Sequence, residues 1–418
     1  MQKFLTASVD FFLSLISHED FKRNYWQSWC RQIELRLLLP MLLYKKGGMS
    51  MQKIEDIDVN FKVNEAIDNG TVYYNCMDKP FSLHGFYTPV ETGKFIRLPQ
   101  SFSTDERVNS GVRRLMFNTS GGRVRFVTDS KIVNVLVNLS TPVRFMAHMA
   151  ESGISGFDMY VASPDRKTKP LYKKTFIPSE VTIDAGNYSG GYEFEDNKLR
   201  EITINFPLYN GVESLYIGLS EGCTLKEAKP YSVELPMVFY GSSVTQGGCA
   251  SRPGTNYTHL LSRWLDADFI NLGFSGSDHG EPALAEYIAT IPMSVFIHAY
   301  GYNAPSKVHY ENTYYPFYKT IRDAKPTLPI VMMSSPVCTD IKTESIAKKM
   351  TEYREIVIKA YEKAIASGDK NVYLIDGFTL LGDNEGAEAT VDGTHPTDLG
   401  FYNMAKTMYP FLEKILFG

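Results

Sequence analysis

The chain has 418 residues, a formal net charge of −4 and hydrophobic side chains at 44% of its positions. This length and apolar content suffice for two domains with separate cores. The slight negative charge gives no long-range attraction to nucleic acids or anionic membranes, so neither is expected as a partner. Five cysteines without paired spacing indicate neither a disulfide framework nor a structural zinc site.

Residues 1–50 are predicted to be an extension outside the functional fold. Two apolar runs, 11–16 and 35–43, are too short to cross a membrane, which takes about 20 residues. Neither run has the flanks of a conventional signal peptide, which favours a cytoplasmic location without stable membrane insertion. The functional protein is predicted to begin near Met49 or Met51, at a glycine-containing boundary.

Residues 51–232 are predicted to form an antiparallel β-sandwich. Several short segments alternate apolar with polar residues, which places one face of each strand toward a core and the other outward. Turns rich in glycine and asparagine separate these segments at the spacing expected of a sandwich. The clearest predicted strands are 123–127, 132–137, 144–148 and 201–206.

From residue 233 to the end, strands alternate with helices. This pattern predicts an α/β domain with a parallel sheet that helices cover on both faces. In such sheets, ligands bind beyond the carboxyl ends of the strands. The predicted strands are 236–240, 269–272, 294–298, 329–333 and 371–375, and the predicted helices are 256–265, 283–290, 314–324, 344–367 and 399–415.

Chemically competent residues lie beyond the strands of this region. Ser243, Gly273 and Asn303 lie at or just after the ends of the first three strands, and Asp392 and His395 precede the last helix. We expect the loops that carry them to meet at one edge of the sheet. A serine hydroxyl becomes an effective nucleophile when a histidine accepts its proton and a carboxylate orients that histidine. Ser243, His395 and Asp392 are therefore the candidate nucleophile, base and orienting acid.

In this order the motifs resemble the sequence blocks of the SGNH, or GDSL-like, hydrolase family over residues 233–418. The Gly-Ser-Ser at 241–243 is similar to the nucleophile block, and the Asp-Gly-Thr-His at 392–395 to the last block. The resemblance implies a flavodoxin-like three-layer α/β fold and a serine esterase.

The resemblance also implies an oxyanion hole. Its donors would be the backbone N–H groups of Ser243 and Gly273 and the side-chain amide of Asn303. Donors aimed at the charge that develops in the transition state commonly contribute more to catalysis than any other single effect. A residue without Cβ at Gly273 would let the backbone approach the reacting carbonyl closely.

The upstream Gly-Phe-Asp-Met-Tyr at 156–160 is similar to the GxDLY motif of a β-rich domain that precedes a subset of these esterases. This resemblance joins residues 51–232 and 233–418 in one architecture. Taken by themselves, the five residues also fit an ordinary strand that follows a glycine turn.

Two positions depart from the family pattern. Ser242 replaces the usual acidic residue before the nucleophile, and Ala304 replaces the acidic residue that usually follows the oxyanion asparagine. Neither change removes a residue of the triad or of the oxyanion hole. Both change the polarity beside the nucleophile, so substrate preference and rate stay open.

Two functions from different classes fit the sequence. The first is a serine esterase that removes a short acyl group, such as acetyl, from a carbohydrate or a small-molecule ester. The alternative is a glycan-binding protein whose hydrolase-like domain is weak or inactive. A triad does not define the leaving group, so a thioesterase, a phospholipid deacylase and a peptidase also stay open.

No metal and no cofactor are predicted. Asp278, His279, His298 and His395 do not have the spacing of converging metal ligands. His279 fits a solvated loop, and His298 fits a hydrogen-bonded histidine in the core. Cys249, close behind the nucleophile motif, fits an inert buried thiol. The pattern leaves the oligomeric state open.

Overall fold

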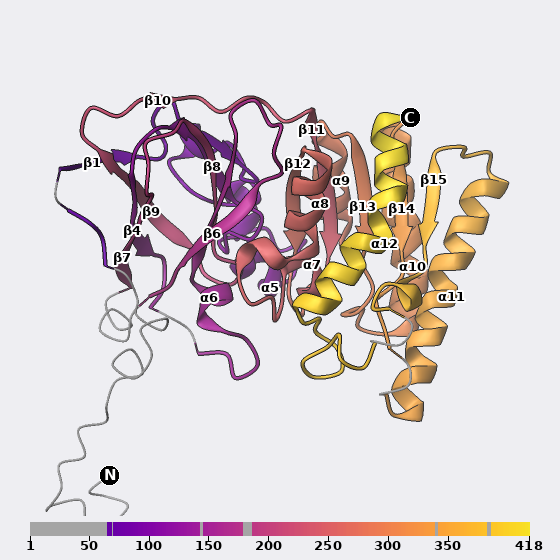
Figure 1. The fold of residues 1–418 in the computed structure, drawn as a ribbon. Coiled ribbons are helices and arrows are strands. Elements are labelled where there is room, and N and C mark those ends of the chain that lie inside the picture. The colour runs from indigo at the N-terminus through magenta and orange to yellow at the C-terminus, as the bar shows by residue number, and fades with distance from the viewer. Residues whose placement is uncertain (1–64, 69, 143–144, 179–185, 339–341, 383–385) are drawn as a thin grey trace, which may run out of the picture. The chain divides into compact units, whose positions relative to one another are not determined.

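The computed structural model describes residues 65–68, 70–142, 145–178, 186–338, 342–382 and 386–418 (Figure 1). These residues all belong to one compact unit of the chain. The predicted extension and the predicted start near Met49 or Met51 lie outside them. Among the helices of the described part, none is long and apolar enough to cross a membrane.

The amino-terminal part is a sandwich of two antiparallel sheets. Its strands are β1 (Thr71–Asn75), β2 (Ser82–His84), β3 (Arg123–Thr128), β4 (Ile132–Leu139), β5 (Phe157–Ala162), β6 (Leu171–Phe176), β7 (Asn187–Glu193), β8 (Arg200–Asn205), β9 (Val212–Ser220) and β10 (Leu225–Lys226). One sheet has the order β1-β9-β4-β7, and the other has the order β10-β3-β8-β5-β6, with β2 paired to β3. Apolar side chains of both sheets, including Phe126 and Ile217, form one buried core. The predicted β-sandwich is confirmed.

The amino-terminal part also contains three short helices: α4 (Pro89–Thr92), α5 (Ser110–Leu115) and α6 (Glu151–Ile154). The buried side chains of α5 and α6 pack in the apolar clusters of the following α/β part. The predicted strand at 144–148 is wrong, because the described residues 145–148 form irregular backbone and a turn. Phe145 is 91% exposed, whereas Met149 is buried in a core of the following α/β part. The alternation of apolar and polar residues here belongs to a loop that packs against the α/β part, not to a strand paired in a sheet.

The carboxy-terminal part is a three-layer α/β domain. Its strands are β11 (Val233–Gly241), β12 (Ala267–Gly273), β13 (Val295–Ala299), β14 (Ile330–Met333) and β15 (Val372–Ile375), and its helices are α7 (Ser243–Gln246), α8 (Tyr257–Leu265), α9 (Pro282–Thr290), α10 (Lys307–Ala324), α11 (Glu344–Ala366) and α12 (Asp398–Phe417). The strands are parallel in the order β12-β11-β13-β14-β15. This is the flavodoxin-like order, and it confirms the predicted fold.

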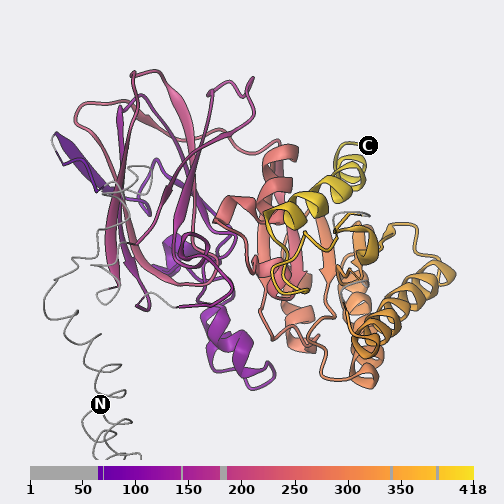
Figure 2. The ribbon, with the colours of Figure 1, turned by 60° about the horizontal axis from the view of Figure 1, so that its bottom comes forward.

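Both faces of this sheet are covered by helices (Figure 1, Figure 2). Val238 and Tyr240 of β11 lie in one apolar cluster with side chains of α9, α10 and α11. Met237 and Phe239 lie in the opposite cluster with side chains of α8 and α12. Successive residues of a strand point to opposite faces, so a strand buried on both faces is a continuous apolar run.

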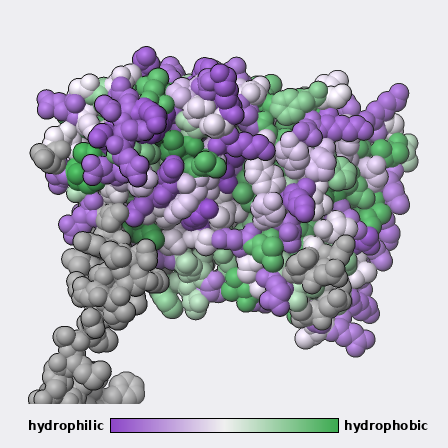
Figure 3. Space-filling model, in the orientation of Figure 1, coloured by the Kyte–Doolittle hydropathy of each residue, from purple (hydrophilic) through white to green (hydrophobic). Residues whose placement is uncertain are grey.

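The outward face of the sandwich is not solvated at β3. All six residues of this strand are buried, and Arg123 and Arg125 are 1% and 2% exposed. Arg123 binds the side chain of Asp268 on β12, so the polar face of β3 packs against the α/β domain. Elsewhere, on the face that Figure 3 shows, hydrophobic residues are scattered among hydrophilic ones.

Candidate active site

Ser243, His395 and Asp392 meet beyond the carboxyl end of β11. The Nε2 atom of His395 lies 3.0 Å from Ser243 Oγ, and its Nδ1 atom lies 2.7 Å from Asp392 Oδ2. Both distances are those of hydrogen bonds. His395 can therefore accept the proton of Ser243 while Asp392 binds the other ring nitrogen, which is the arrangement of a serine hydrolase triad.

The two residues before Ser243 suit the local backbone structure. Ser242 caps the single turn α7, because its hydroxyl accepts a hydrogen bond from the Val244 N–H at 3.2 Å. Serine and aspartate are both favourable at this position, so the departure from the family pattern preserves the local structure. At Gly241, a Cβ would lie 2.5 Å from Thr245 Oγ1, which excludes larger residues.

Asp392 is held in its ionised form. Its Oδ1 atom accepts hydrogen bonds from the backbone N–H groups of His395, at 2.8 Å, and Thr394, at 2.9 Å. Burial favours a higher pKa for this carboxyl, but the hydrogen bonds from the backbone and ring of His395 outweigh it and lower the pKa to about 2. The carboxylate is therefore charged at neutral pH and can stabilise a protonated imidazole.

The carboxyl group of Asp278 orients Asn303, and the sequence did not predict this role. Its side-chain Nδ2 donates to Asp278 Oδ1, and the Gly301 N–H donates to Asp278 Oδ2 at 3.3 Å. Asp278 is fully buried, and burial raises its pKa to about 8. A side-chain amide has two N–H donors. One N–H of Asn303 therefore fixes the group, and the other has no acceptor among the described residues.

Gly273 has a structural role beside the one predicted from the sequence. Its N–H already donates to Asn271 Oδ1 at 2.9 Å. A Cβ at Gly273 would lie 2.2 Å from the backbone nitrogen of Gln246, so the glycine is required by close packing against α7. Its part in an oxyanion hole stays a prediction.

Gly276, in the same loop, is an additional candidate donor. It has a φ of +68°, and the position of its absent Cβ faces open space. Within the described residues its N–H has no acceptor, and the preceding Ser275 N–H binds Gln246 Oε1 at 2.9 Å, which holds the loop against α7. The Gly-x-x-Gly spacing was visible in the sequence, but only the structure shows that the N–H of Gly273 has an acceptor within the protein and that of Gly276 has none among the described residues.

His148 enters the site from the sandwich, and no signal in the sequence predicted it. Its ring lies 5.4 Å from the ring of His395, between centroids. One ligand atom each of His148, Cys249 and His395 lies within 4.8 Å of the other two. A metal bound there would use the imidazole that contacts Ser243, so metal binding and the triad exclude each other. Burial raises the pKa of Cys249 to about 12, which fits an unreactive thiol.

His279 and His298, the other two histidines considered from the sequence, make no contact with the triad among the hydrogen bonds of the described residues. His298 is buried in the core as predicted, but its hydrogen bond was not found: neither ring nitrogen has a partner among the described residues. Its ring instead stacks on Tyr314 with centroids 4.2 Å apart, and burial lowers its pKa to about 3. The carbonyl of His279 accepts hydrogen bonds from Tyr300 and His309, so this residue helps to hold its loop.

The motif at 156–160 connects the sandwich to the loop behind the nucleophile. Asp158, which is fully buried, accepts hydrogen bonds from Asn205 at 2.7 Å, Arg252 at 2.9 Å and the Gly254 N–H at 2.8 Å. Gly254 is pressed so closely against this strand that a Cβ would lie 2.4 Å from the ring of Tyr160. The motif therefore does more than form an ordinary strand.

Comparison with known families agrees with this architecture. Residues 234–413 match the GDSL-like lipase/acylhydrolase family, and residues 71–225 match the N-terminal domain of SGNH hydrolase-type esterases. The carboxy-terminal part of this chain is a GDSL-like hydrolase domain. It is accordingly a hydrolase of ester bonds, and the resemblance drawn from the sequence is confirmed.

Solved structures share both parts of this GDSL-like hydrolase. A GDSL-like lipase from Bacteroides ovatus is 28% identical with a TM-score of 0.73, and the match covers 83% of this chain and 98% of that one. A salicylyl-acyltransferase from a tetracycline biosynthetic pathway is 20% identical with a TM-score of 0.67, covering 84% and 98%. A family two carbohydrate esterase from Cellvibrio japonicus is 16% identical with a TM-score of 0.53, covering 83% and 98%. The search of curated proteins gave no significant match.

Proposed function

We propose that this GDSL-like hydrolase removes a short acyl group, such as acetyl, from a carbohydrate, with Ser243, His395 and Asp392 as its catalytic triad. The observation that carries the proposal is the continuous pair of hydrogen bonds from Ser243 Oγ through the imidazole to the carboxylate, at 3.0 and 2.7 Å. Each residue of the triad thereby has the partner that its role requires.

The reaction proceeds in two steps. Ser243 Oγ attacks the ester carbonyl as His395 Nε2 takes its proton, and the sugar hydroxyl leaves with that proton from the imidazole. Water then attacks the acyl-serine, His395 again transfers the proton, and the carboxylic acid is released. The oxyanion of each tetrahedral intermediate is stabilised by the amide of Asn303 and the N–H of Ser243, which begins α7 and has no partner within the helix.

A carbohydrate substrate is supported by the rim of the site. His148 lies beside His395. Tyr302 lies in the loop that carries Asn303; burial raises the pKa of its hydroxyl to about 12, and the nearby Thr394 and Asp392 modify that pKa in opposite directions. Aromatic side chains with polar tips suit contacts with sugar rings and hydroxyls. The shared fold with family two carbohydrate esterases, one of them from Clostridium thermocellum in complex with cellohexaose, points to the same substrate class.

The alternative is a glycan-binding protein with a weak or inactive hydrolase-like domain. It was suggested by the two departures from the family pattern, and their surroundings in the structure give it less support. Ala304, which replaces the usual acid, is 4% exposed and packs in the hydrophobic core. Ser242 is 3% exposed and caps α7. Neither departure places a new side chain between Ser243 and His395.

The test compares p-nitrophenyl acetate, butyrate and octanoate with acetylated xylo- and cello-oligosaccharides. Wild type is assayed beside Ser243→Ala and beside Ser345→Ala, an exposed serine on α11. We expect acetate to be released from the oligosaccharides by wild type and by Ser345→Ala, but not by Ser243→Ala. Binding of oligosaccharides without turnover of any ester would instead support the glycan-binding alternative.

A further inference from the structure

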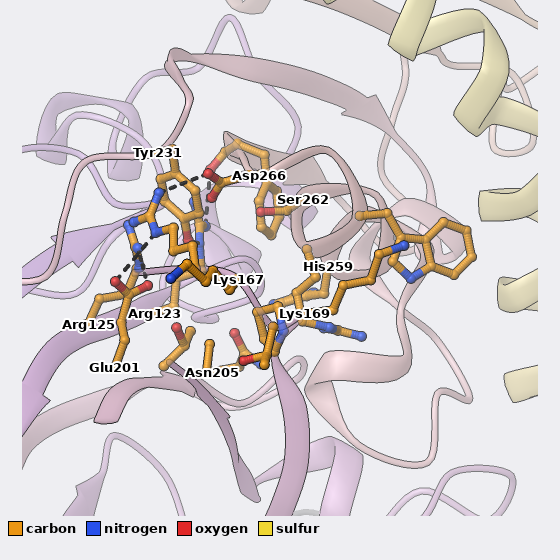
Figure 4. Close-up of a pocket in the computed structure, with 18 residues that line it drawn as sticks. Arg123, Arg125, Lys167, Lys169, Glu201, Asn205, Tyr231, His259, Ser262 and Asp266 are labelled. Atoms are coloured by element: carbon orange, nitrogen blue, oxygen red, sulfur yellow. Dashed lines mark hydrogen bonds and ion pairs between the residues drawn. The ribbon is translucent and has the colours of Figure 1, made fainter. Parts of the chain in front are cut away.

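A separate cavity of about 330 Å³, whose lining Figure 4 shows, is lined by residues at the start of β12, at the end opposite to the active-site loops. Its walls are strands β3 and β8 and the β5–β6 loop of the sandwich, together with helix α8 and the start of β12. Asp266 and Phe269 line it, whereas the site described above lies beyond Gly273 at the other end of the strand. The mechanism proposed for ester hydrolysis uses none of the residues that line this cavity.

The lining is strongly cationic. Six basic side chains but only two carboxylates line it: Arg123, Arg125, Arg166, Lys167, Lys169 and Arg263 against Glu201 and Asp266. In the view of Figure 4, Arg123, Arg125 and Glu201 lie on one side, and Lys169 and His259 lie on the other. The whole chain is slightly acidic, so this concentration of positive charge is local.

Three of the arginines are matched by carboxylates. Arg125 binds Glu201 at 2.7 Å, Arg166 binds Asp266 at 2.8 Å, and Arg123 binds Asp268 beside the cavity. The remaining cations are less well matched. Among the described residues, the one carboxylate paired with Lys167 is the exposed Asp165, at 3.1 Å, and such exposed pairs are weak. Lys169 and Arg263 have no carboxylate partner within the described residues.

Buried hydrogen-bonding atoms also face this region without partners. His259 is 1% exposed, and neither of its ring nitrogens has a hydrogen bond among the described residues. Nη1 of Arg263 is likewise unpartnered, although its Nη2 donates to the Gly254 carbonyl at 2.7 Å. Buried polar atoms are nearly always hydrogen-bonded, so a cluster of three such nitrogens indicates a place for an external acceptor.

We propose that this cavity binds a compact oxyanion group, with Arg263 and His259 donating hydrogen bonds and Lys169 and Lys167 supplying charge. Charge-assisted hydrogen bonds to oxyanions are about twice as strong as neutral ones, and a guanidinium suits them by its geometry. The cavity is larger than an inorganic phosphate. Trp264 also lines it, which leaves an apolar surface for an organic part of monosaccharide size, as in a sugar phosphate.

Calorimetric titration tests the proposal with inorganic phosphate, glucose 6-phosphate and uncharged glucose at low ionic strength. We expect both phosphates to bind wild type and Ser243→Ala alike, and glucose not to bind. Tighter binding of glucose 6-phosphate would show that the organic part contributes, and equal binding would show that the oxyanion alone is recognised. Absence of binding by both phosphates overturns the proposal, whatever the outcome of the esterase assay.

Matched variants locate the site. Lys169→Glu reverses an exposed charge, which should leave the fold intact and weaken phosphate binding by about tenfold or more. The control is Lys359→Glu, at a lysine on α11 that is also exposed but does not line the cavity; this variant should bind phosphate as wild type does. Phosphate should also shift the NMR signals of the His259 ring. Equal loss of affinity in both variants, or no change at His259 when phosphate binds, would place the anion elsewhere and refute the assignment.

Discussion

Asp158→Ala provides a strong test of how the sandwich supports the catalytic domain. Asp158 is fully buried on β5 and accepts three hydrogen bonds, one of them from the charged Arg252. The Arg252 side chain is itself only 23% exposed. Alanine removes the acceptor and leaves Arg252, Asn205 and the Gly254 N–H without it.

The expected loss of stability follows from these contacts. Removal of one partner from a buried ion pair typically costs about 3–5 kcal/mol, because the other charge remains in a poorly solvated place. Since Arg252 retains some contact with solvent, we expect about 3 kcal/mol for Asp158→Ala. Asp158→Asn keeps the shape and one acceptor oxygen, so its loss should be smaller, about 1–2 kcal/mol.

Urea unfolding followed by fluorescence and circular dichroism measures the difference. The control is Asp323→Ala, which removes an exposed carboxylate paired with Lys319 on α10 and should change stability by no more than about 0.5 kcal/mol. If Asp158→Ala unfolds at the same urea concentration as Asp323→Ala, the hydrogen bonds of Asp158 do not stabilise the packing of the two parts.

Three further predictions concern the active site. Asn303→Ala should retain its circular dichroism spectrum and lose about 2.7–4 kcal/mol of transition-state stabilisation, measured as a 100- to 1,000-fold lower kcat on p-nitrophenyl acetate; an unchanged kcat would remove Asn303 from the mechanism. The folded-state pKa of Asp278, about 8, lies above its unfolded value of about 4, so the folded state keeps a proton that the unfolded state releases, and stability should fall as the pH rises through this window. Urea midpoints at pH 5 and 9 should therefore differ more for wild type than for Asp278→Asn, and parallel shifts would contradict this. Zinc should inhibit hydrolysis through His148, Cys249 and His395, and Cys249→Ser should be less sensitive to zinc in the same assay, whereas equal sensitivity would exclude this cluster.

Several features of the α/β domain were predictable because they depend on short-range patterns. Apolar runs separated by amphipathic helices indicate parallel strands, and the ends of such strands share an edge. That rule, together with the family resemblance, predicted that Ser243 and His395 meet, although they are 152 positions apart in the sequence. The carboxylate of Asp392 needed no long-range information, since three residues separate it from the histidine that it binds.

Other features depend on contacts that no local pattern encodes. The alternation of apolar and polar residues in β3 shows which side chains share a face of the strand. It does not show that the α/β domain covers the face that carries Arg123. His148 lies in an irregular loop, and only tertiary packing brings it to His395. The sequence predicted that the backbone N–H of Gly273 donates to the substrate. In the structure this N–H donates to the side chain of Asn271, two residues earlier. In each case the sequence gives the chemical type of the group, but it does not give the tertiary contact that the group makes.

The contacts between the two parts favour a structural role for the sandwich within the catalytic unit. Arg97 donates to the Gly273 carbonyl at 2.6 Å, and Ser120 donates to the Gln246 carbonyl at 2.6 Å. Asp158 binds the loop that follows α7. These three contacts end on the segments that carry or flank the proposed nucleophile and the proposed oxyanion donors, and a separately acting glycan-binding module would not need them. Because positioning errors of about 1 Å can reduce catalysis by roughly 100-fold, such supports can affect turnover without touching the substrate.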